Sequence, residues 1–388
     1  MKQPRTAEQV FPSEGPPGPR HPSLLLPSFL LLFACLTGLL FGSTAFANLT
    51  PFGIGGGGFL QAALFHPTDD NYILIGGDVG GIWRSTDGGA TWATWNAGLN
   101  ITNHEGHSYY VDDLVAVDNA GVTFYAATRG GIWKAPDNGS WEQKSAGFYR
   151  EAGKPRGAII PFSSLDWNED DLLVAGAGYS RLDNPDSELT RYPGVSFALD
   201  NSDPGLVSEK YTVWTLDPLN ANAEWTELPN ALSTEQSARD ITVRTYDIGG
   251  IPTDYIAVVT REGVYVHDGS VWNDFTPSWY GPSGTEPADS ETAWTVHLSE
   301  RKTIYITRRR FADEFGTTGG VYCIPDVTTS SDPANDWLLL EDPNARTPST
   351  KFDFVLLTVV DGTGTAPDTL YLSGTPARGE IFRAEYTP

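Results

Sequence analysis

Two aspartates stand close together in the stretch GGDVGGIWRSTDGGATW, residues 76–92. A carboxylate can act as a general base or acid on a bound substrate, or it can accept hydrogen bonds from the amides of a tight turn. Asp78 lies in the glycine-rich sequence DVGG, and Asp87 lies in the sequence STDGGATW. Which role each aspartate has depends on the strands that position it.

The sequence around the two aspartates recurs along the chain. Residues 74–95 have a close copy in residues 125–143 and weaker copies in residues 257–275, 317–326 and 376–385. Each copy follows an alternating apolar run of the kind that forms a short strand, and a further unit, stretched by an insertion, occupies residues 161–232. The six units begin near residues 59, 110, 161, 239, 292 and 351. This spacing is the period of a β-propeller blade.

The repeat therefore predicts an all-β fold, a single β-propeller with six or seven four-stranded blades. A sandwich of two sheets is the alternative fold. The last unit stops after its third strand. We expect either that an N-terminal strand completes the ring or that the chain is cut short.

The strands place the two aspartates at opposite ends of their blade. Residues 71–75, 81–85 and 91–95 read as the second, third and fourth strands. Because these strands run in alternating directions, Asp78 and Asp87 are separated by one five-residue strand, about 17 Å at roughly 3.3 Å per residue. They cannot share a site within this blade.

The sequence STDGGATW, residues 85–92, matches the Asp-box pattern S-x-D-x-G-x-T-W. We expect Asp87 to accept hydrogen bonds from turn amides, the glycines to adopt positive φ, and the tryptophan to pack into the blade. Residues 135–141 are a degenerate copy. The motif predicts a structural role for its members, which are Ser85, Asp87, Gly89, Thr91 and Trp92.

Asp78 differs in type from the residues at the matching position of the other repeat units. When the turns between second and third strands are aligned on their glycines, the position of Asp78 is taken by Thr128, Thr260 and Thr317 in other units. A carboxylate at this one turn makes Asp78 the candidate catalytic base. The alternative is that Asp78 only caps the amides of its own turn.

The same end of the blades gathers further candidates. Three more aspartates near the starts of innermost strands are weaker candidates for a catalytic acid: Asp113, Asp240 and Asp353. The candidates for substrate binding are Tyr110, Arg129, Trp279 and Tyr280. Carboxylates among aromatic rings suit the binding or hydrolysis of a glycan, and they also suit an ordinary solvated rim.

The first 47 residues differ from the rest. Residues 24–42 are apolar and uncharged, and the small-residue sequence AFA follows at 45–47, which predicts a signal peptide and export. A signal anchor is the alternative, and we expect no other membrane contact. Residues 48–388, the expected propeller domain, hold a single cysteine, Cys323, so no internal disulfide is expected. They carry 22 basic and 47 acidic side chains, and this net negative charge disfavours binding to nucleic acid.

Residues 55–92 resemble the N-terminal blade of glycoside hydrolase family 74, the xyloglucan-cleaving enzymes. The shared features are a glycine run, the sequence FHP after the first strand, the DVGG turn and the Asp-box. The resemblance implies an inverting hydrolysis of a β-glucan such as xyloglucan, with Asp78 as the base. It also implies that the acid comes from a second propeller, whereas this chain has the length of one. The enzyme would then be incomplete or inactive, use an acid on its own ring, or meet a second propeller as a partner.

Two other functions stay open at this point. One is a non-catalytic propeller that binds a polysaccharide, an oligosaccharide or a protein. The other is a sialidase, although the arginine motif of that family is missing near the start of the domain. No cofactor and no metal are expected, because HEGH at 104–107 is not a zinc-protease motif and GIGGGG at 53–58 is not a phosphate loop.

Overall fold

The computed structural model describes residues 60–78, 80–99, 107–144, 162–177, 213–228, 238–260, 263–280, 292–309, 320–341, 353–362, 366–375 and 381–387. Contacts divide the chain into Met1–Pro51 and Phe52–Pro388, and the first unit lies outside the described residues. The signal segment expected at residues 1–47 therefore stays a prediction.

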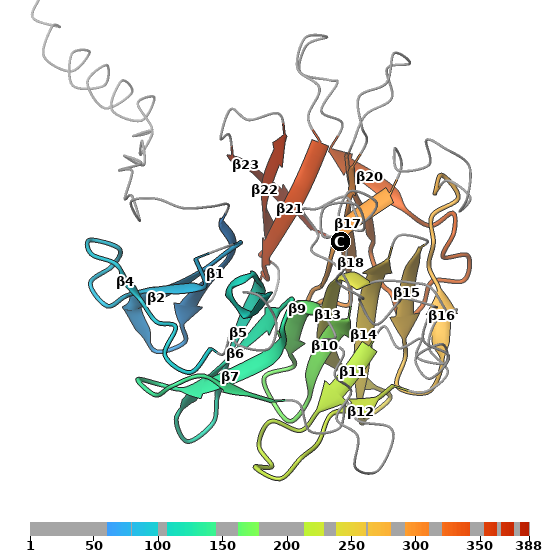
Figure 1. The fold of residues 1–388 in the computed structure, drawn as a ribbon. Helices are drawn as coiled ribbons and strands as arrows, with labels where there is room; N and C mark the ends of the chain where they lie inside the picture. The colour runs from blue at the N-terminus through green and yellow to red at the C-terminus, as the bar shows by residue number, and fades with distance from the viewer. Residues whose placement is uncertain are drawn as a thin grey trace, which may run out of the picture. The chain divides into compact units, whose positions relative to one another are not determined.

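The described residues form six antiparallel sheets, in chain order (Figure 1). The first holds β1 (Leu60–His66), β2 (Asp69–Gly77), β3 (Ile82–Ser85) and β4 (Ala93–Thr94). The second follows the 3₁₀ turn η1 (His107–Tyr109) and holds β5 (Val111–Asp118), β6 (Val122–Thr128), β7 (Gly131–Pro136) and β8 (Glu142–Gln143). The third holds β9 (Phe162–Trp167), β10 (Leu173–Ala177), β11 (Val213–Leu216) and β12 (Thr226–Glu227).

The second half repeats this plan. The fourth sheet holds β13 (Ala238–Ile248), β14 (Ile251–Thr260), β15 (Val264–His267) and β16 (Trp272–Asp274). The fifth holds β17 (Thr292–Leu298), β18 (Ile304–Arg309), β19 (Gly320–Ile324) and β20 (Leu338–Glu341). The sixth has three described strands, β21 (Asp353–Val360), β22 (Asp368–Thr375) and β23 (Ile381–Tyr386).

The six sheets are arranged as a β-propeller, which confirms the predicted fold class. Within each sheet the strands pair in sequence order, and the first strands β1, β5, β9, β13, β17 and β21 contact one another from sheet to sheet. The second strands read as continuous apolar runs because a neighbouring sheet covers each face, as at Tyr72–Ile75 of β2 and Tyr255–Val259 of β14. Five of the six sheets have four strands.

A bulge recurs near the beginning of the first strands. In β1, β5 and β13 the register shifts by one residue, at Gln61, Asp112 and Arg239 respectively. The pairing of β9 shifts at Ser163, and Trp294 lies in the matching irregularity of β17. All five of these side chains are buried. The bulge thus gives each of these sheets one extra buried residue at the end of the blade where Asp78 lies.

Tryptophans tie successive sheets together. The indole N–H of Trp141 in the second sheet donates to the carbonyl of Trp95 in the first, at 2.8 Å. Trp225 in the third donates to Lys144 O in the second at 3.1 Å, and Trp337 in the fifth donates to Phe275 O in the fourth at 2.9 Å. The three links join the outer parts of sheets whose cores otherwise pack through aliphatic and aromatic side chains.

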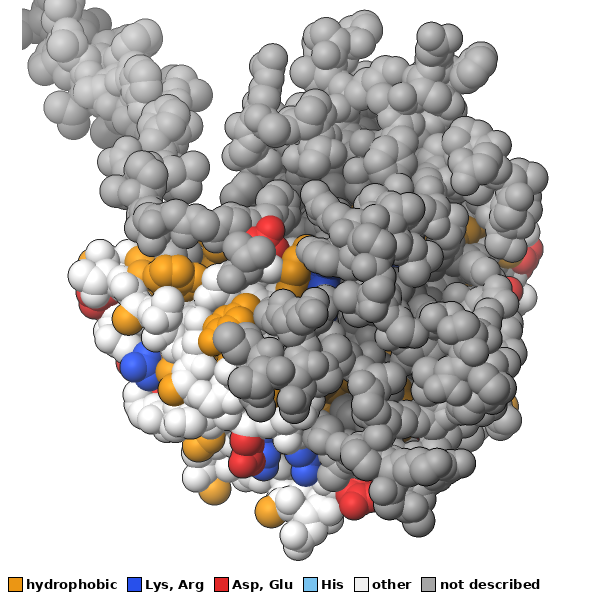
Figure 2. All heavy atoms as spheres, in the orientation of Figure 1, with side chains coloured by type: hydrophobic (Ala, Val, Ile, Leu, Met, Phe, Trp, Pro, Cys, Tyr) orange, Lys and Arg blue, Asp and Glu red, His pale blue; other side chains and the backbone are white. Residues whose placement is uncertain are grey.

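The described surface mixes hydrophobic, acidic and basic side chains in the view of Figure 2. Cys323 is buried in β19 and is a free thiol. Nowhere in the described ranges is there a helix of the length and hydropathy needed to span a membrane.

Candidate functional site

Asp78 lies in the turn between β2 and β3. The Gly77 amide donates to Gly81 O at 3.0 Å, so three residues, 78 to 80, stand between the paired positions. Gly81 has a φ of 71°, which favours glycine at the point where the chain enters β3. The Asp78 side chain is half-buried.

Two anchors outside the turn hold it in place. The amide side chain of Asn96 accepts from the Ile82 N–H at 2.8 Å and donates to Gly80 O at 2.9 Å. The Gly81 N–H donates to Tyr109 O of η1 at 3.0 Å. The turn that carries Asp78 is therefore fixed both by its own sheet and by the segment that leads into the second sheet.

The corresponding turns of the second and fourth sheets are closed by a threonine hydroxyl. Thr128 Oγ1 donates to Gly131 O at 2.8 Å and accepts from the Gly130 N–H at 3.0 Å. Thr260 Oγ1 donates to Gly263 O at 3.2 Å and accepts from the Gly263 N–H at 3.0 Å. In both sheets the hydroxyl therefore forms hydrogen bonds with a backbone carbonyl and a backbone N–H group of the turn.

The strand register changes the comparison between these turns. Thr128 pairs with Gly131 across two residues, whereas Gly77 pairs with Gly81 across three. Gly77 therefore occupies the structural position of the threonine, and Asp78 is the first residue of a turn that is one residue longer. In the fifth sheet the partner of Gly320 is Arg308, because a long connection replaces the short turn, and Thr317 lies outside the described residues.

Asp87 lies in the turn between β3 and β4, at the other end of the blade, and its carboxylate accepts three hydrogen bonds. Oδ1 accepts from Ser85 Oγ and from the Thr91 N–H, both at 2.8 Å, and Oδ2 accepts from Thr91 Oγ1 at 2.6 Å. Gly88 and Gly89 have φ values of 70° and 90°, and Trp92 Nε1 donates to Gly89 O at 3.0 Å. The bonds from Thr91, first from its side chain and then from its amide, lower the pKa of Asp87. The carboxylate holds the turn together.

Asp113 and Asp240 occupy equivalent positions, each just after the bulge of its strand. Asp113 accepts from the Leu114 N–H and, at 2.9 Å, from the Leu165 N–H of the next sheet. Asp240 accepts from the Ile241 N–H and, at 3.0 Å, from the Val296 N–H of the next sheet. Both carboxylates therefore join neighbouring first strands. A role as catalytic acid stays a prediction for both.

Asp353 begins β21, where its backbone pairs with Thr375. Its side chain lies outside the described part of the structure. The loops that we expected beside these residues, including the insertion at 179–194, also lie outside the described ranges.

Tyr110 and Arg129 meet beside the turn of the second sheet. The guanidinium carbon lies 3.2 Å from the centre of the Tyr110 ring, and the Arg129 N–H donates to Tyr110 O at 3.1 Å. Arg129 Nε is 3.9 Å from an oxygen of Asp112, and both side chains are buried. Their predicted part in substrate binding stays a prediction.

Trp279 and Tyr280 lie between the fourth and fifth sheets. Their rings stack with centres 5.8 Å apart, and the Arg308 guanidinium lies 4.3 Å from the Trp279 ring. The Tyr280 hydroxyl donates to Thr260 O at 2.8 Å and accepts from the Ala293 N–H at 3.2 Å. These contacts link the two sheets, and contact with a sugar stays a prediction for both rings.

Sequence reasoning did not select Arg239 and Trp294. The Arg239 guanidinium lies 4.9 Å from the Trp294 ring and donates to Ala293 O at 3.3 Å, so a buried cation bridges the fourth and fifth sheets. With Arg129 and Arg308 it makes three buried arginines, each against an aromatic ring, at the Asp78 end of the blades. The sequence does carry a signal, because the charged pair Arg239 and Asp240 stands at the start of an apolar strand. Its meaning depends on the bulge, which buries the Arg239 side chain.

In the described part of the chain, no three His, Cys, Asp or Glu side chains are grouped so as to hold a metal ion. The described residues at the Asp78 end offer a carboxylate on a fixed turn, with buried arginines and aromatic rings on the adjoining sheets.

Comparison with known proteins supports the fold. No family model and no curated protein sequence matches the chain. Among solved structures, an ancestral glycoside hydrolase family 74 enzyme aligns with 87% of this chain at 14% identity and a TM-score of 0.57, and the chain spans 37% of that enzyme's length. The family 74 enzyme of Niastella koreensis aligns at 16% identity and a TM-score of 0.48 over 86% of this chain and 46% of its own. YCF48 bound to the D1 peptide aligns at 12% identity and a TM-score of 0.47 over 85% and 78%.

Proposed function

We propose that this chain is a glycan-active propeller of the family 74 type, which binds a β-glucan such as xyloglucan at the end of the blades that carries Asp78. The observation that carries the proposal is the turn between β2 and β3. It is one residue longer than its counterparts in the second and fourth sheets, is anchored by Asn96 and Tyr109, and presents a half-buried carboxylate. The shared fold with the ancestral family 74 enzyme supports the proposal.

In the catalytic form of the proposal, Asp78 accepts a proton from the water that attacks the anomeric carbon. An inverting reaction needs an acid about 6.5–9.5 Å from the base, so that the water fits between them. The candidates for that acid are Asp113, Asp240, Asp353 and a carboxylate of a second propeller.

Binding without cleavage is the second candidate function, and one observation favours it. Asp113 and Asp240 each accept backbone N–H groups of two neighbouring strands. These bonds hold both carboxylates between neighbouring first strands, where they serve the fold. A propeller with a fixed base and no acid would hold a glycan, or a protein partner, without cutting it.

Two further features are part of the proposal, an Asp-box and a signal peptide. The hydrogen bonds of the Ser85–Trp92 turn are those expected of an Asp-box, and residues 1–47 have the pattern of a signal peptide. A signal peptide directs its protein to secretion, which we include in the proposal.

The test is the release of reducing ends from xyloglucan and related β-glucans by the purified protein. Removal of a general base lowers the rate by about 10²–10⁴-fold, so the Asp78→Asn variant should lose at least about 100-fold. Asp118→Asn is the matched control, because Asp118 is exposed at the last position of β5, at the opposite end of its blade. No release by the wild type, or equal release by the Asp78→Asn variant, would overturn the catalytic form and leave binding.

A further inference from the structure

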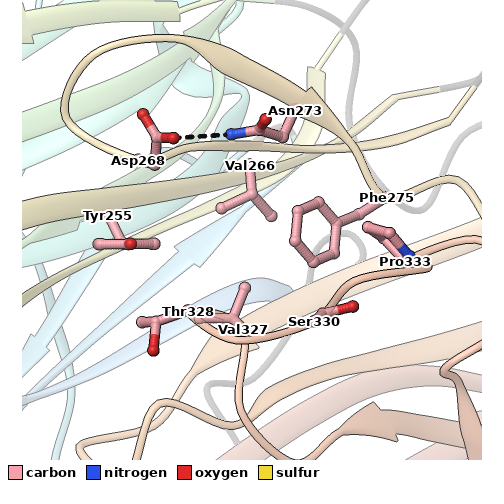
Figure 3. A pocket seen from close by; sticks show the side chains of 9 residues that line it. All are labelled: Tyr255, Val266, Asp268, Asn273, Phe275, Val327, Thr328, Ser330 and Pro333. Carbon is pink, nitrogen blue, oxygen red and sulfur yellow. Dashed lines mark hydrogen bonds between the residues drawn. The ribbon is translucent and has the colours of Figure 1, made fainter.

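A pocket of about 180 Å³ lies between the fourth and fifth sheets, and Figure 3 shows the side chains that line it. It is formed at the turn between β15 and β16 and at the connection between β19 and β20. Its volume is far larger than one water molecule needs and smaller than the roughly 300–1,000 Å³ of sites for drug-sized ligands. The pocket therefore suits one small group rather than a glycan chain.

The walls of the pocket are held by contacts between the two sheets. The Ser278 N–H donates to Ala334 O at 2.9 Å, and Trp337 Nε1 donates to Phe275 O at 2.9 Å. Val266, Phe275 and Val327 give it buried apolar walls, and Pro333 lies beside the Phe275 ring in Figure 3. The shape of the pocket is thus built by the fold rather than by one mobile loop.

The polar part of the lining carries one carboxylate and no basic side chain. Asp268 Oδ1 accepts from the N–H groups of Ser270 and Val271 and from the Ser270 hydroxyl, which leaves Oδ2 with one described partner, Asn273 Nδ2, at 3.0 Å. Although burial raises the pKa of Asp268, the bonds from Val271, Ser270 and Asn273 outweigh it and lower the pKa to about 2. The carboxylate is charged at neutral pH.

The other polar groups of the pocket offer mainly acceptors. Thr328 and Ser330 already donate their hydroxyl protons to Asp326 and Asp336, at 2.6 and 2.8 Å, so the two hydroxyl groups can offer a ligand only acceptor lone pairs. Among the described residues, Asn273 Oδ1 accepts no hydrogen bond. The Tyr255 hydroxyl is the lining's remaining donor, and burial together with the charges of Asp268 and Asp326 raises its pKa.

An excess of acceptors, an ionised carboxylate and apolar walls define the ligand. We propose that this pocket binds a small organic cation, an ammonium group attached to a compact apolar body. The ammonium donates to Asp268 and to the hydroxyl and amide oxygens around it, while the apolar body lies against Phe275 and Val327. An anion would meet the carboxylate without a compensating cation, and a metal ion would lack the three-ligand cluster it needs within the described residues.

Three probes that share one ring and differ in charge test this proposal on the full chain. Benzylamine is the cation, benzyl alcohol is its neutral counterpart, and benzoate is the anion. We expect benzylamine to bind at least tenfold more tightly than benzyl alcohol in isothermal titration, and benzoate not to bind. Equal affinity for benzylamine and benzyl alcohol, or tighter binding of benzyl alcohol, would overturn the proposal without any variant.

Two variants then locate the binding site. Asp268→Asn should weaken benzylamine by about tenfold or more, whereas Asp332→Asn should leave its affinity within twofold. Asp332 is an exposed acid on the same connection that does not line the pocket, so it controls for long-range charge. Equal losses in both variants would contradict a site at Asp268. Xyloglucan hydrolysis or binding is a separate assay, so its failure would leave the result for this pocket unchanged.

Discussion

Single residues at the two ends of the first blade illustrate two uses of a carboxylate. Both carboxylate oxygens of Asp87 accept hydrogen bonds within its own turn, from Ser85 and Thr91. Asp78 lies in a turn whose backbone is held by Asn96 and Tyr109, whereas the turn of the second sheet is closed by the Thr128 hydroxyl. We therefore give Asp87 a structural role and propose a functional role for Asp78.

The structural role of Asp87 predicts a dependence of stability on pH. Its pKa is lowered in the folded protein, so its contribution is fully present above the unfolded value of about 3.9 and is lost as the pH falls through the folded value. We expect the Asp87→Asn variant to melt at a lower temperature than the wild type at pH 7, with a difference that shrinks below about pH 4. Melting curves between pH 7 and pH 2.5 measure this.

The control for that series is Asp118→Asn, which removes an exposed acid at the end of β5. Its melting temperature should follow the wild type across the whole range. A difference for Asp87→Asn that stays constant from pH 7 to pH 2.5 would show that its carboxylate charge does not hold the turn.

At the scale of elements, the links between sheets come from tryptophans and aspartates rather than from the apolar core alone. Trp141, Trp225 and Trp337 donate to the preceding sheet, while Asp113 and Asp240 accept from the following one. Each sheet is therefore tied to its neighbours by polar bonds as well as by packing.

Trp225 offers a graded test of this linkage. Phe keeps most of the buried ring but removes the bond to Lys144 O, so Trp225→Phe should lower the free energy of unfolding by about 1 kcal/mol. Trp225→Ala also removes the packing and should cost about 3–5 kcal/mol. Urea unfolding measures both, and Trp167→Phe, which breaks a local bond to Asp170 O, should cost less than Trp225→Phe. Equal losses for the two Phe variants would contradict a linking role for Trp225.

The sequence predicts these elements well where the repeat is regular and poorly where the register shifts. The unit starts near 59, 110, 161, 239, 292 and 351 lie within two residues of the first strands, because alternating apolar runs mark a strand directly. The bulges at Gln61, Asp112 and Arg239 leave no such mark, since one extra residue in a strand only offsets the alternation. The extra residue of the turn between β2 and β3 is equally hidden, so alignment on glycines placed Asp78 at the position of Thr128, whereas the strand register places Gly77 there.

At the scale of the whole molecule, the propeller brings the residues of one end together from all along the chain. Asp78, Arg129, Arg239 and Arg308 belong to four different sheets, and no local pattern in the sequence connects them. Strand direction places all four at the same end of their sheets. The proposed glycan site depends on this arrangement, whereas the pocket at Asp268 lies at the other end of β15 and functions independently of it.

The most direct test of glycan binding at the Asp78 end is the mobility of the protein in native gels that contain xyloglucan. We expect the wild type to be retarded in proportion to the polysaccharide. Asp78→Arg should abolish the retardation by placing a bulky cation in the fixed turn, and Asp118→Arg, the same charge change at the other end of the blades, should not. A wild type that migrates equally with and without xyloglucan, or equal losses in the two variants, would contradict the account.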